Sequence, residues 1–162
     1  MESISDIEQM AEAAWDAGHN RLAQRLLQRG ADLGSDGCML NLGYAYDVGL
    51  GTRTDKVMAM RWYKRAYRRG HASAASNIAV LYREQGRDRM VFAWYLRAAE
   101  LGDGGAMLEL AKLLLAGRGV RRSPSEALGY LRGALSTKFI CEESWEEAEE
   151  LMQQLAPKIV HE

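Results

Sequence analysis

A chain of 162 residues with a formal net charge of −1 fits one ordinary domain, and its overall charge gives no reason to expect a polyanion as partner. Its scarcity of proline and its abundance of Ala, Leu, Met, Glu and Arg favour helix over sheet, because these residues lose little rotamer freedom in a helix. No stretch approaches the ~20 apolar residues of a membrane span, and the start lacks the basic and apolar regions of a secretion signal. We therefore expect an all-α protein in the cytoplasm.

The predicted elements, in chain order, are four helix pairs over residues 2–34, 35–70, 71–102 and 103–137. An internal repeat identifies them, since MRWYKRAYRRG of the second pair returns as FAWYLRAAELG in the third, with the Trp-Tyr pair, the Ala and the closing Gly in register. A unit that must stack on its own copy explains such a duplication better than a catalytic motif does.

The first helix of each later pair carries a bulky, a small and a second bulky residue on one face, as in Leu42, Gly43 and Tyr46. A small residue between two bulky ones lets a neighbouring helix approach closely. The first pair shows the pattern only faintly. The aromatic residues occupy repeating positions, so we expect them in the core rather than in a ligand site: Tyr46, Trp62, Tyr63, Tyr82, Trp94 and Tyr95.

The loops inside the pairs have two lengths. The second and fourth pairs have longer loops with Gly49-x-Gly51 and Gly117-x-Gly119, while the first and third have tight turns. These glycines are expected to supply positive φ angles rather than a phosphate cradle, because their flanks are helical and no strand precedes them. Ser5 with Glu8, and Ser123 with Pro124 and Glu126, are the expected capping boxes.

A capping helix is predicted over about residues 142–156. Its apolar stripe consists of Trp145, Ala148, Leu151, Met152 and Leu155, and glutamates fill the other faces. Pro157 is expected to end the helix. Such a helix would cover the last pair with its apolar side and face water with its charges.

Catalytic and metal-binding patterns are missing from the sequence. Cys38 and Cys141 are too far apart for a metal knuckle and are expected to be reduced packing thiols. His19, His71 and His161 offer neither metal-ligand spacing nor the order of a triad. We therefore expect no catalytic residue, no metal and no cofactor.

LGYAYDVGLG followed by WYKRA resembles the Sel-one-like (Sel1-like) repeat, a relative of the tetratricopeptide repeat with a longer inner loop. The second and fourth pairs have its spacing, the third is closer to the tetratricopeptide length, and the first is degenerate. The resemblance implies a right-handed α/α solenoid of about four helix-turn-helix repeats plus the cap. It implies that the protein binds other proteins and carries out no reaction.

In such arrays the first helices line the concave wall, so their residues that repeat packing does not need are the candidates for partner binding. The alternative is that some of them pack between repeats. The resulting row has an acidic end, an aromatic and aliphatic middle and a basic end, which is typical of an interface with a charged rim. The candidates are Glu12, Trp15, Leu40, Tyr44, Asp47, Ser76, Val80, Arg83, Leu108, Lys112 and Leu115.

The sequence leaves the identity of the partner open. A protein scaffold or adaptor is the favoured interpretation, and an immunity protein that neutralises a bacterial toxin is the alternative. A basic run on one second helix is best explained as a solvated face, with an acidic protein and then RNA as the alternatives: Arg61, Lys64, Arg65, Arg68 and Arg69. Nucleic acid is the less favoured partner.

Overall fold

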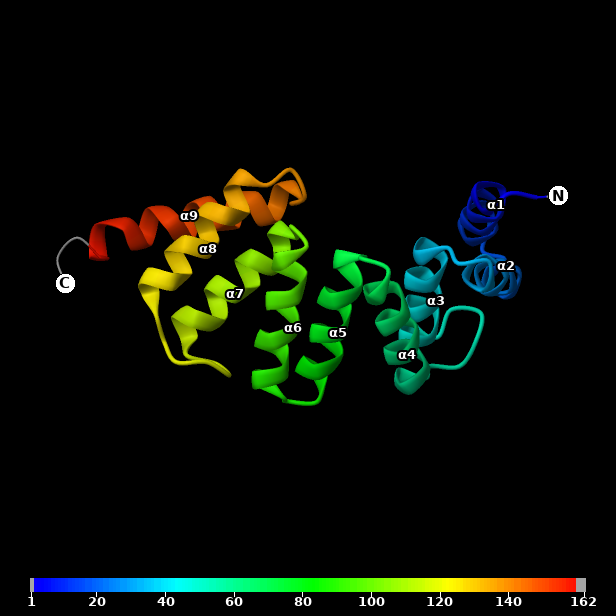
Figure 1. Ribbon diagram of the computed structural model, residues 1–162, viewed down its shortest axis with the longest axis horizontal. Helices are drawn as coiled ribbons and strands as arrows, with labels where there is room; N and C mark the ends of the chain where they lie inside the picture. The colour runs from blue at the N-terminus through cyan, green and yellow to red at the C-terminus, as the bar shows by residue number, and fades with distance from the viewer. Residues whose placement is uncertain (1, 160–162) are drawn as a thin grey trace. The chain divides into compact units, whose positions relative to one another are not determined.

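The computed structural model describes the backbone of residues 2–159 and the side chains of residues 2–155, and every regular element within this range is an α-helix (Figure 1). The chain divides into two compact units, residues 1–74 and 75–162, which we call unit 1 and unit 2. Unit 1 contains α1 (Ile4–Asp16), α2 (Asn20–Asp32), α3 (Asp36–Val48) and α4 (Lys56–Arg68). Unit 2 contains most of α5 (Ala72–Glu84), and then α6 (Asp88–Glu100), α7 (Gly104–Ala116), α8 (Pro124–Ser136) and α9 (Glu142–Ile159).

Unit 2 repeats the helices of unit 1 at a constant offset. Each helix from α1 to α4 has a counterpart of the same length that begins 68 residues later, as Ile4 and Ala72 or Lys56 and Pro124 illustrate. Each unit therefore contains one helix pair with a tight turn and one with a longer loop. This accounts for the two loop lengths in the sequence, because the repeating body contains two pairs rather than one.

Helices α1, α3, α4, α7 and α8 begin after a residue whose side chain accepts a bond from a free backbone N–H, whereas the N-cap side chains of α2 and α6 make no such bond. Ser123 accepts from the Glu126 N–H and Pro124 occupies the first turn, so this part of the prediction for α8 is confirmed. The capping box itself is incomplete, because the Ser123 N–H donates to the Leu114 carbonyl rather than to the Glu126 side chain. At the start of α1 the prediction is wrong, because the capping box pairs Ser3 with Asp6. Ser3 has the extended backbone that an N-cap needs, whereas Ser5 already lies inside the helix.

The longer loops depend on glycines for two reasons. Gly49, Gly51, Gly117 and Gly119 all have φ between 67° and 80°, which confirms the predicted positive angles. Gly51 also lies against the start of α2, where an added Cβ would be 2.3 Å from the Asn20 carbonyl oxygen. Gly119 approaches the Asp88 carbonyl oxygen at the start of α6 in the same way. Each loop thus fastens one helix pair to the preceding one within its unit.

Replacing Gly51 by Ala is expected to lower the free energy of unfolding by about 2–3 kcal/mol, because strain from positive φ adds to the clash with Asn20. Gly18 is the matched control, since its φ of 74° is nearly that of Gly51 and nothing lies within 4 Å of its added Cβ. Gly18→Ala should cost only about 1 kcal/mol. Urea denaturation measures both, and equal losses would show that the close approach contributes nothing.

The core of unit 1 lies between its four helices. Ile7, Leu27, Leu42 and Trp62 are buried in one cluster. Gly43 permits a close approach, since an added Cβ would be 2.6 Å from the ring of Tyr63, which is itself fully buried. The predicted small position between two bulky ones is therefore confirmed at this point of the fold.

In unit 2, α9 packs against α8 and contacts α7 (Figure 1). Ala148 of α9 is completely buried in a cluster with Leu108 of α7 and Leu131 of α8. Leu151, Met152 and Leu155 pack against the same cluster. Trp145, expected in this stripe, is instead 38% exposed, because it lies in the first turn of α9, ahead of the segment that packs.

The end of α9 differs from the prediction. The helix runs to Ile159, beyond the expected boundary near residue 156, and includes position 157. A proline lacks the backbone N–H donor, so it removes one hydrogen bond from the helix. In the last turn a helix can continue past the proline despite the loss of that one bond.

Candidate functional site

The eleven candidate residues all lie within the first helix of a pair, namely α1 and α3 in unit 1 and α5 and α7 in unit 2. We call this surface the helix-A face. The two units differ in whether these side chains are available.

In unit 1, the structure brings together two aromatic candidates from different helices. Trp15 on α1 and Tyr44 on α3 meet edge to face, with ring centroids 6.2 Å apart and planes at 83°. Trp15 is half-buried and also packs against the core of unit 1, whereas Tyr44 is 46% exposed. The pair therefore offers an aromatic surface that is anchored at one side and open at the other.

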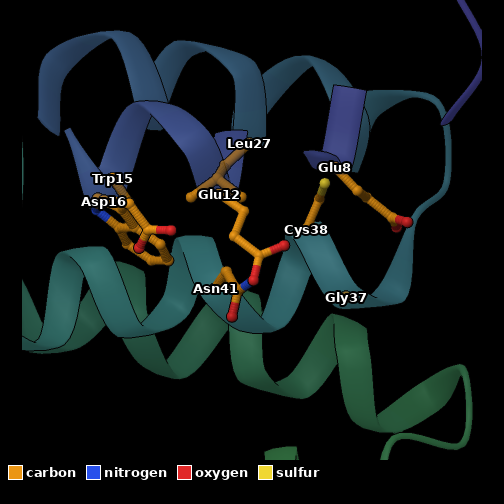
Figure 2. A pocket seen from close by; sticks show the side chains of 8 residues that line it. All are labelled: Glu8, Glu12, Trp15, Asp16, Leu27, Gly37, Cys38 and Asn41. Carbon is orange, nitrogen blue, oxygen red and sulfur yellow. The ribbon is translucent and has the colours of Figure 1, made fainter. Parts of the chain in front are cut away.

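An open pocket of about 510 Å³ lies beside this aromatic pair, between α1 and α3 (Figure 2). We call it the acid pocket, because three carboxylates line it. Figure 2 shows Glu12 extending from α1 toward Asn41 on α3, with Asp16 beside Trp15. The full lining consists of Glu8, Glu12, Trp15, Asp16, Leu27, Gly37, Cys38 and Asn41.

The three carboxylates differ in their partners. Glu8 accepts a hydrogen bond from the hydroxyl of Ser35, the N-cap of α3, and so helps to fix α3 against α1. Among residues 2–155, the side chains of Glu12 and Asp16 have no hydrogen bond or ion pair, and both are exposed. Two uncompensated negative charges therefore remain at the mouth of the pocket.

The other two candidates of unit 1 are engaged with the protein itself. Leu40 is half-buried and packs against the core cluster. Asp47 accepts bonds from the ammonium of Lys56 and, at 3.2 Å, from the hydroxyl of Tyr63, so it joins α3 to α4. Of the unit 1 candidates, Glu12, Trp15 and Tyr44 are thus the ones that line an accessible surface.

In unit 2, the cationic candidates are neutralised by neighbouring acids. Arg83 on α5 pairs with Glu109 on α7, and its guanidinium lies over the ring of Tyr95 at 5.3 Å. Lys112 pairs with Glu109 at 2.7 Å and with Glu147 of α9 at 3.0 Å. The predicted basic end of the row therefore carries no free charge in this network.

The pKa values in this network follow from its geometry. Burial by itself would raise the pKa of Glu109, but the bonds from Lys112 and Arg83 outweigh burial and hold this pKa below its ordinary value. Burial would lower the pKa of Lys112, yet its bonds to Glu109 and Glu147 raise this pKa above the ordinary value. Burial also raises the pKa of Tyr95 to about 12. All of these groups keep one charge state around neutral pH.

The remaining unit 2 candidates divide between packing and exposure. Ser76 donates to Asp103, the N-cap of α7, at 2.7 Å. Leu108 is only 2% exposed, and Leu115 packs against the same cluster, so neither belongs to an open surface. The sequence did not anticipate this burial of Leu108, which arises because α9 contacts α7. Val80 remains exposed.

Sequence reasoning missed several residues of these sites. Asp16 was not among the predicted candidates, although it follows Glu12 by four residues and completes an i, i+4 series from Glu8 that could have revealed it. Glu109 was also missed, although Lys112 stands three residues after it on the same helix face. Asn41 carried no signal, because an isolated amide is common on an exposed helix.

The basic run on α4 is partly structural. The Arg65 guanidinium lies over the ring of buried Trp62 at 4.3 Å, and Arg97 lies over Trp94 at 4.7 Å in the corresponding place on α6. Within residues 2–155, Arg61, Arg68 and Arg69 form no ion pair and are exposed. The α4 surface is thus a solvated face with one stacked arginine.

In the range that the structure describes, no group of three His, Cys, Asp or Glu side chains could hold a metal ion. No helix in that range combines the length and apolar character needed to cross a bilayer.

These observations define the class as an all-α helical-repeat protein built from helix-turn-helix pairs, and comparison with known families identifies the repeat. The profile described as "Sel1 repeat" matches residues 20–35, 37–71, 92–103 and 105–134, more than half of the chain. The chain therefore belongs to the Sel1 repeat family. The two longest matches cover the long-loop pairs α3–α4 and α7–α8, as the resemblance in the sequence indicated.

Solved structures show the same fold. A Sel1 repeat protein from Oxalobacter formigenes is 26% identical with a TM-score of 0.70, over 82% of this chain and 58% of that protein. A protective antigen of uropathogenic Escherichia coli with an SLR fold is 25% identical with a TM-score of 0.66, over 71% of this chain and 26% of that protein. The chain thus spans less than two thirds of either relative.

A third structure, that of MamA, is similar in fold at 19% identity, with a TM-score of 0.60 over 91% of this chain and 81% of that protein. No curated protein sequence gives a significant match. Sel1 repeat proteins generally act as scaffolds for protein interaction and are typically non-enzymatic, and their solenoid fold is the one predicted from the sequence.

Proposed function

We propose that this chain is a non-enzymatic scaffold that binds a partner protein through its helix-A face, with the principal contact on unit 1. The observation that carries the proposal is Tyr44, an exposed aromatic ring held edge to face by Trp15 beside an open pocket. Tyrosine anchors are enriched at the energetic centres of interfaces, because they bury a large area at a small cost in side-chain entropy.

Unit 2 is the weaker candidate for the same role. Its candidates at the positions of Trp15 and Tyr44 are Arg83 and Lys112, and both are already paired with Glu109. A partner would have to break these ion pairs before it could bind either cation. Breaking an ion pair leaves its carboxylate without a partner, and that cost in free energy is larger than the stabilisation an exposed ion pair provides. The contact surface is therefore better placed on α1 and α3.

Replacing Tyr44 by Ala is expected to weaken partner binding by about 2 kcal/mol, or roughly thirtyfold, because the ring is a contact anchor. Helix content and melting temperature should change little, since Tyr44 is 46% exposed. The partner is first isolated by affinity purification on the wild-type protein, and its affinity for both proteins is then measured by calorimetry. Its identity separates an adaptor from an immunity protein.

The control changes charge on α4 and leaves the helix-A face intact. Arg68→Glu with Arg69→Glu is suited to this purpose, whereas Arg65 stacks on Trp62 and would also affect folding. The control should slow association modestly and leave dissociation unchanged. Loss of binding in the control together with full binding by Tyr44→Ala would assign the function to α4, and a steep salt dependence would then indicate RNA.

Cys38 is a buried packing thiol as predicted, whereas Cys141 is exposed, so the prediction is wrong for Cys141. Both thiols are free, which is consistent with a reducing compartment, so a cytoplasmic location belongs to this proposal. Fractionation of cells that produce the tagged protein tests it directly.

A further inference from the structure

We propose that a basic face on α4 binds an acidic face on α9 of a second copy of the chain, so that the protein associates with itself through two different surfaces. The basic face consists of the exposed side chains Arg61, Arg65, Arg68 and Arg69, and the acidic face consists of the exposed side chains Glu142, Glu143, Glu146 and Glu150. Neither face shares a residue with the helix-A face, so this inference is independent of the proposed partner site.

Neither face is neutralised by the chain itself. α4 contains no acidic residue, and the arginines of its basic face form no ion pair within residues 2–155. The four glutamates of the acidic face form none within the same range. Like charges four residues apart on a helix repel each other, so a second copy that supplies the opposite charge relieves repulsion on both helices.

The stacking of repeats does not explain the charges of the basic face. α8 is the counterpart of α4 in unit 2 and begins 68 residues later, where the positions of Arg61 and Arg68 are occupied by Gly129 and Ser136. Arg65 has a packing role, because its guanidinium stacks on a buried tryptophan. The other arginines of the face make no such contact, which leaves them available to a second molecule.

The two faces match in length and in direction. Arg61 and Arg68 are seven residues apart, as are Glu143 and Glu150, so each pair of charges spans about 10 Å, or two helical turns. The arginines extend from the middle of α4 to its C-terminal end, and the glutamates occupy the N-terminal half of α9. An antiparallel arrangement therefore brings opposite charges together and also places opposite ends of the two helix dipoles side by side.

An aromatic residue adds to the acidic face. Trp145 lies next to Glu146 in the sequence and is 38% exposed. Within unit 1 the Arg65 guanidinium already lies over the Trp62 ring at 4.3 Å. An arginine of α4 from a second copy can stack on Trp145 in the same way, which supplies contact area that ion pairs lack.

A second copy is the occupant that the structure itself supplies, because every molecule carries both faces. Exposed ion pairs are individually weak and are screened by salt. We therefore expect association at low ionic strength and high protein concentration, and a monomer in moderate salt. Because the two faces differ, the contact is heterologous, and it generates either a ring or an open chain of molecules.

Sedimentation velocity on the full-length protein tests this over a range of protein concentrations. At about 0.01 M salt, where charges act over ~30 Å, the sedimentation coefficient should rise with concentration. At about 1 M salt, where their range falls to ~3 Å, the rise should disappear. A constant sedimentation coefficient at low salt would overturn the inference.

Charge reversal then locates the contact. Arg61→Glu with Arg68→Glu reverses two charges of the basic face, and Glu146→Lys with Glu150→Lys reverses two of the acidic face. Each variant by itself should associate about tenfold more weakly than the wild type, because like charges now meet. A mixture of both should regain association, since the intact α9 of the first variant can bind the intact α4 of the second. Circular dichroism and melting confirm that both variants are folded.

The matched control is Arg21→Glu with Arg25→Glu, which makes the same change in net charge at exposed positions on α2. This variant should associate as the wild type does. A loss equal to that of the α4 variant would show that net charge decides, and would overturn the inference.

Other outcomes separate this inference from the proposed function. Tyr44→Ala should associate with itself as the wild type does, and a loss there would move the contact to the helix-A face and overturn the inference. A mixture of the two charge-reversed variants that stays monomeric would do the same. Binding of a short RNA to α4 without self-association would assign the basic face to nucleic acid. Each of these results leaves the measurement of partner binding by Tyr44→Ala unaffected.

Discussion

Replacing Trp62 or Trp94 by Ala should lower the free energy of unfolding by about 3–5 kcal/mol in each case. Both side chains are buried, with exposed fractions of 5% and 9%. Trp62 lies in the core cluster of unit 1. Its indole N–H has no hydrogen-bond partner among residues 2–155, so its contribution comes from packing and from the arginine above its ring.

Denaturation in urea, followed by circular dichroism, measures both losses. Trp145→Ala is the control within the same chain, because this ring is 38% exposed and should cost less than about 1 kcal/mol. Losses below about 1 kcal/mol at both Trp62 and Trp94 would contradict the register of the repeat, since they would place both rings on the surface.

Deleting residues 142–162 is expected to cause aggregation and a lower melting temperature. The deletion removes α9, which covers Leu108 and Leu131 and supplies the buried Ala148. The apolar surface exposed by this deletion should associate with other copies of the protein, as terminal repeats without caps do. The loss of the Glu147 carboxylate would also leave the two cations Lys112 and Arg83 to share the Glu109 carboxylate.

Light scattering after size-exclusion chromatography measures this outcome. A shorter deletion of residues 157–162 is the control, since it retains Ala148, Leu151, Met152 and Leu155. It should remain monodisperse under conditions in which the larger deletion aggregates. A monodisperse larger deletion with unchanged melting would show that α9 is not a cap.

Local pattern was sufficient to predict the helices. Apolar residues at spacings of three and four indicate which side of each helix is buried. Leu42 and Ala79 are both buried, as this pattern predicts. Gly49 and Gly51 were predictable as turn residues, since glycine alone adopts positive φ without strain. These features depend on a few neighbouring residues, which is why a single sequence revealed them.

Which residues of the polar helix faces stay exposed to solvent depends on contacts between residues far apart in the chain. Leu108 looks free in a helical pattern, but a helix that starts more than thirty residues later covers it. In the sequence Arg83 has no acidic partner nearby on its own helix face, but in the fold it pairs with Glu109 of α7. Periodicity indicates which side of a helix is polar, but which part of that side stays open is decided by the helices that pack there.

The sequence by itself thus determined the fold class, the helix pairs, the turn glycines and the burial of Trp62, Tyr63, Trp94 and Tyr95, although Tyr46 and Tyr82 are only partly buried. Only the tertiary structure decided that Glu12, Asp16, Trp15 and Tyr44 share an open surface in unit 1, while Arg83 and Lys112, which stand at the positions of Trp15 and Tyr44 in unit 2, are held in ion pairs. The physical reason is that helix formation responds to local spacing, whereas a pocket requires side chains from two helices to meet without filling the space between them.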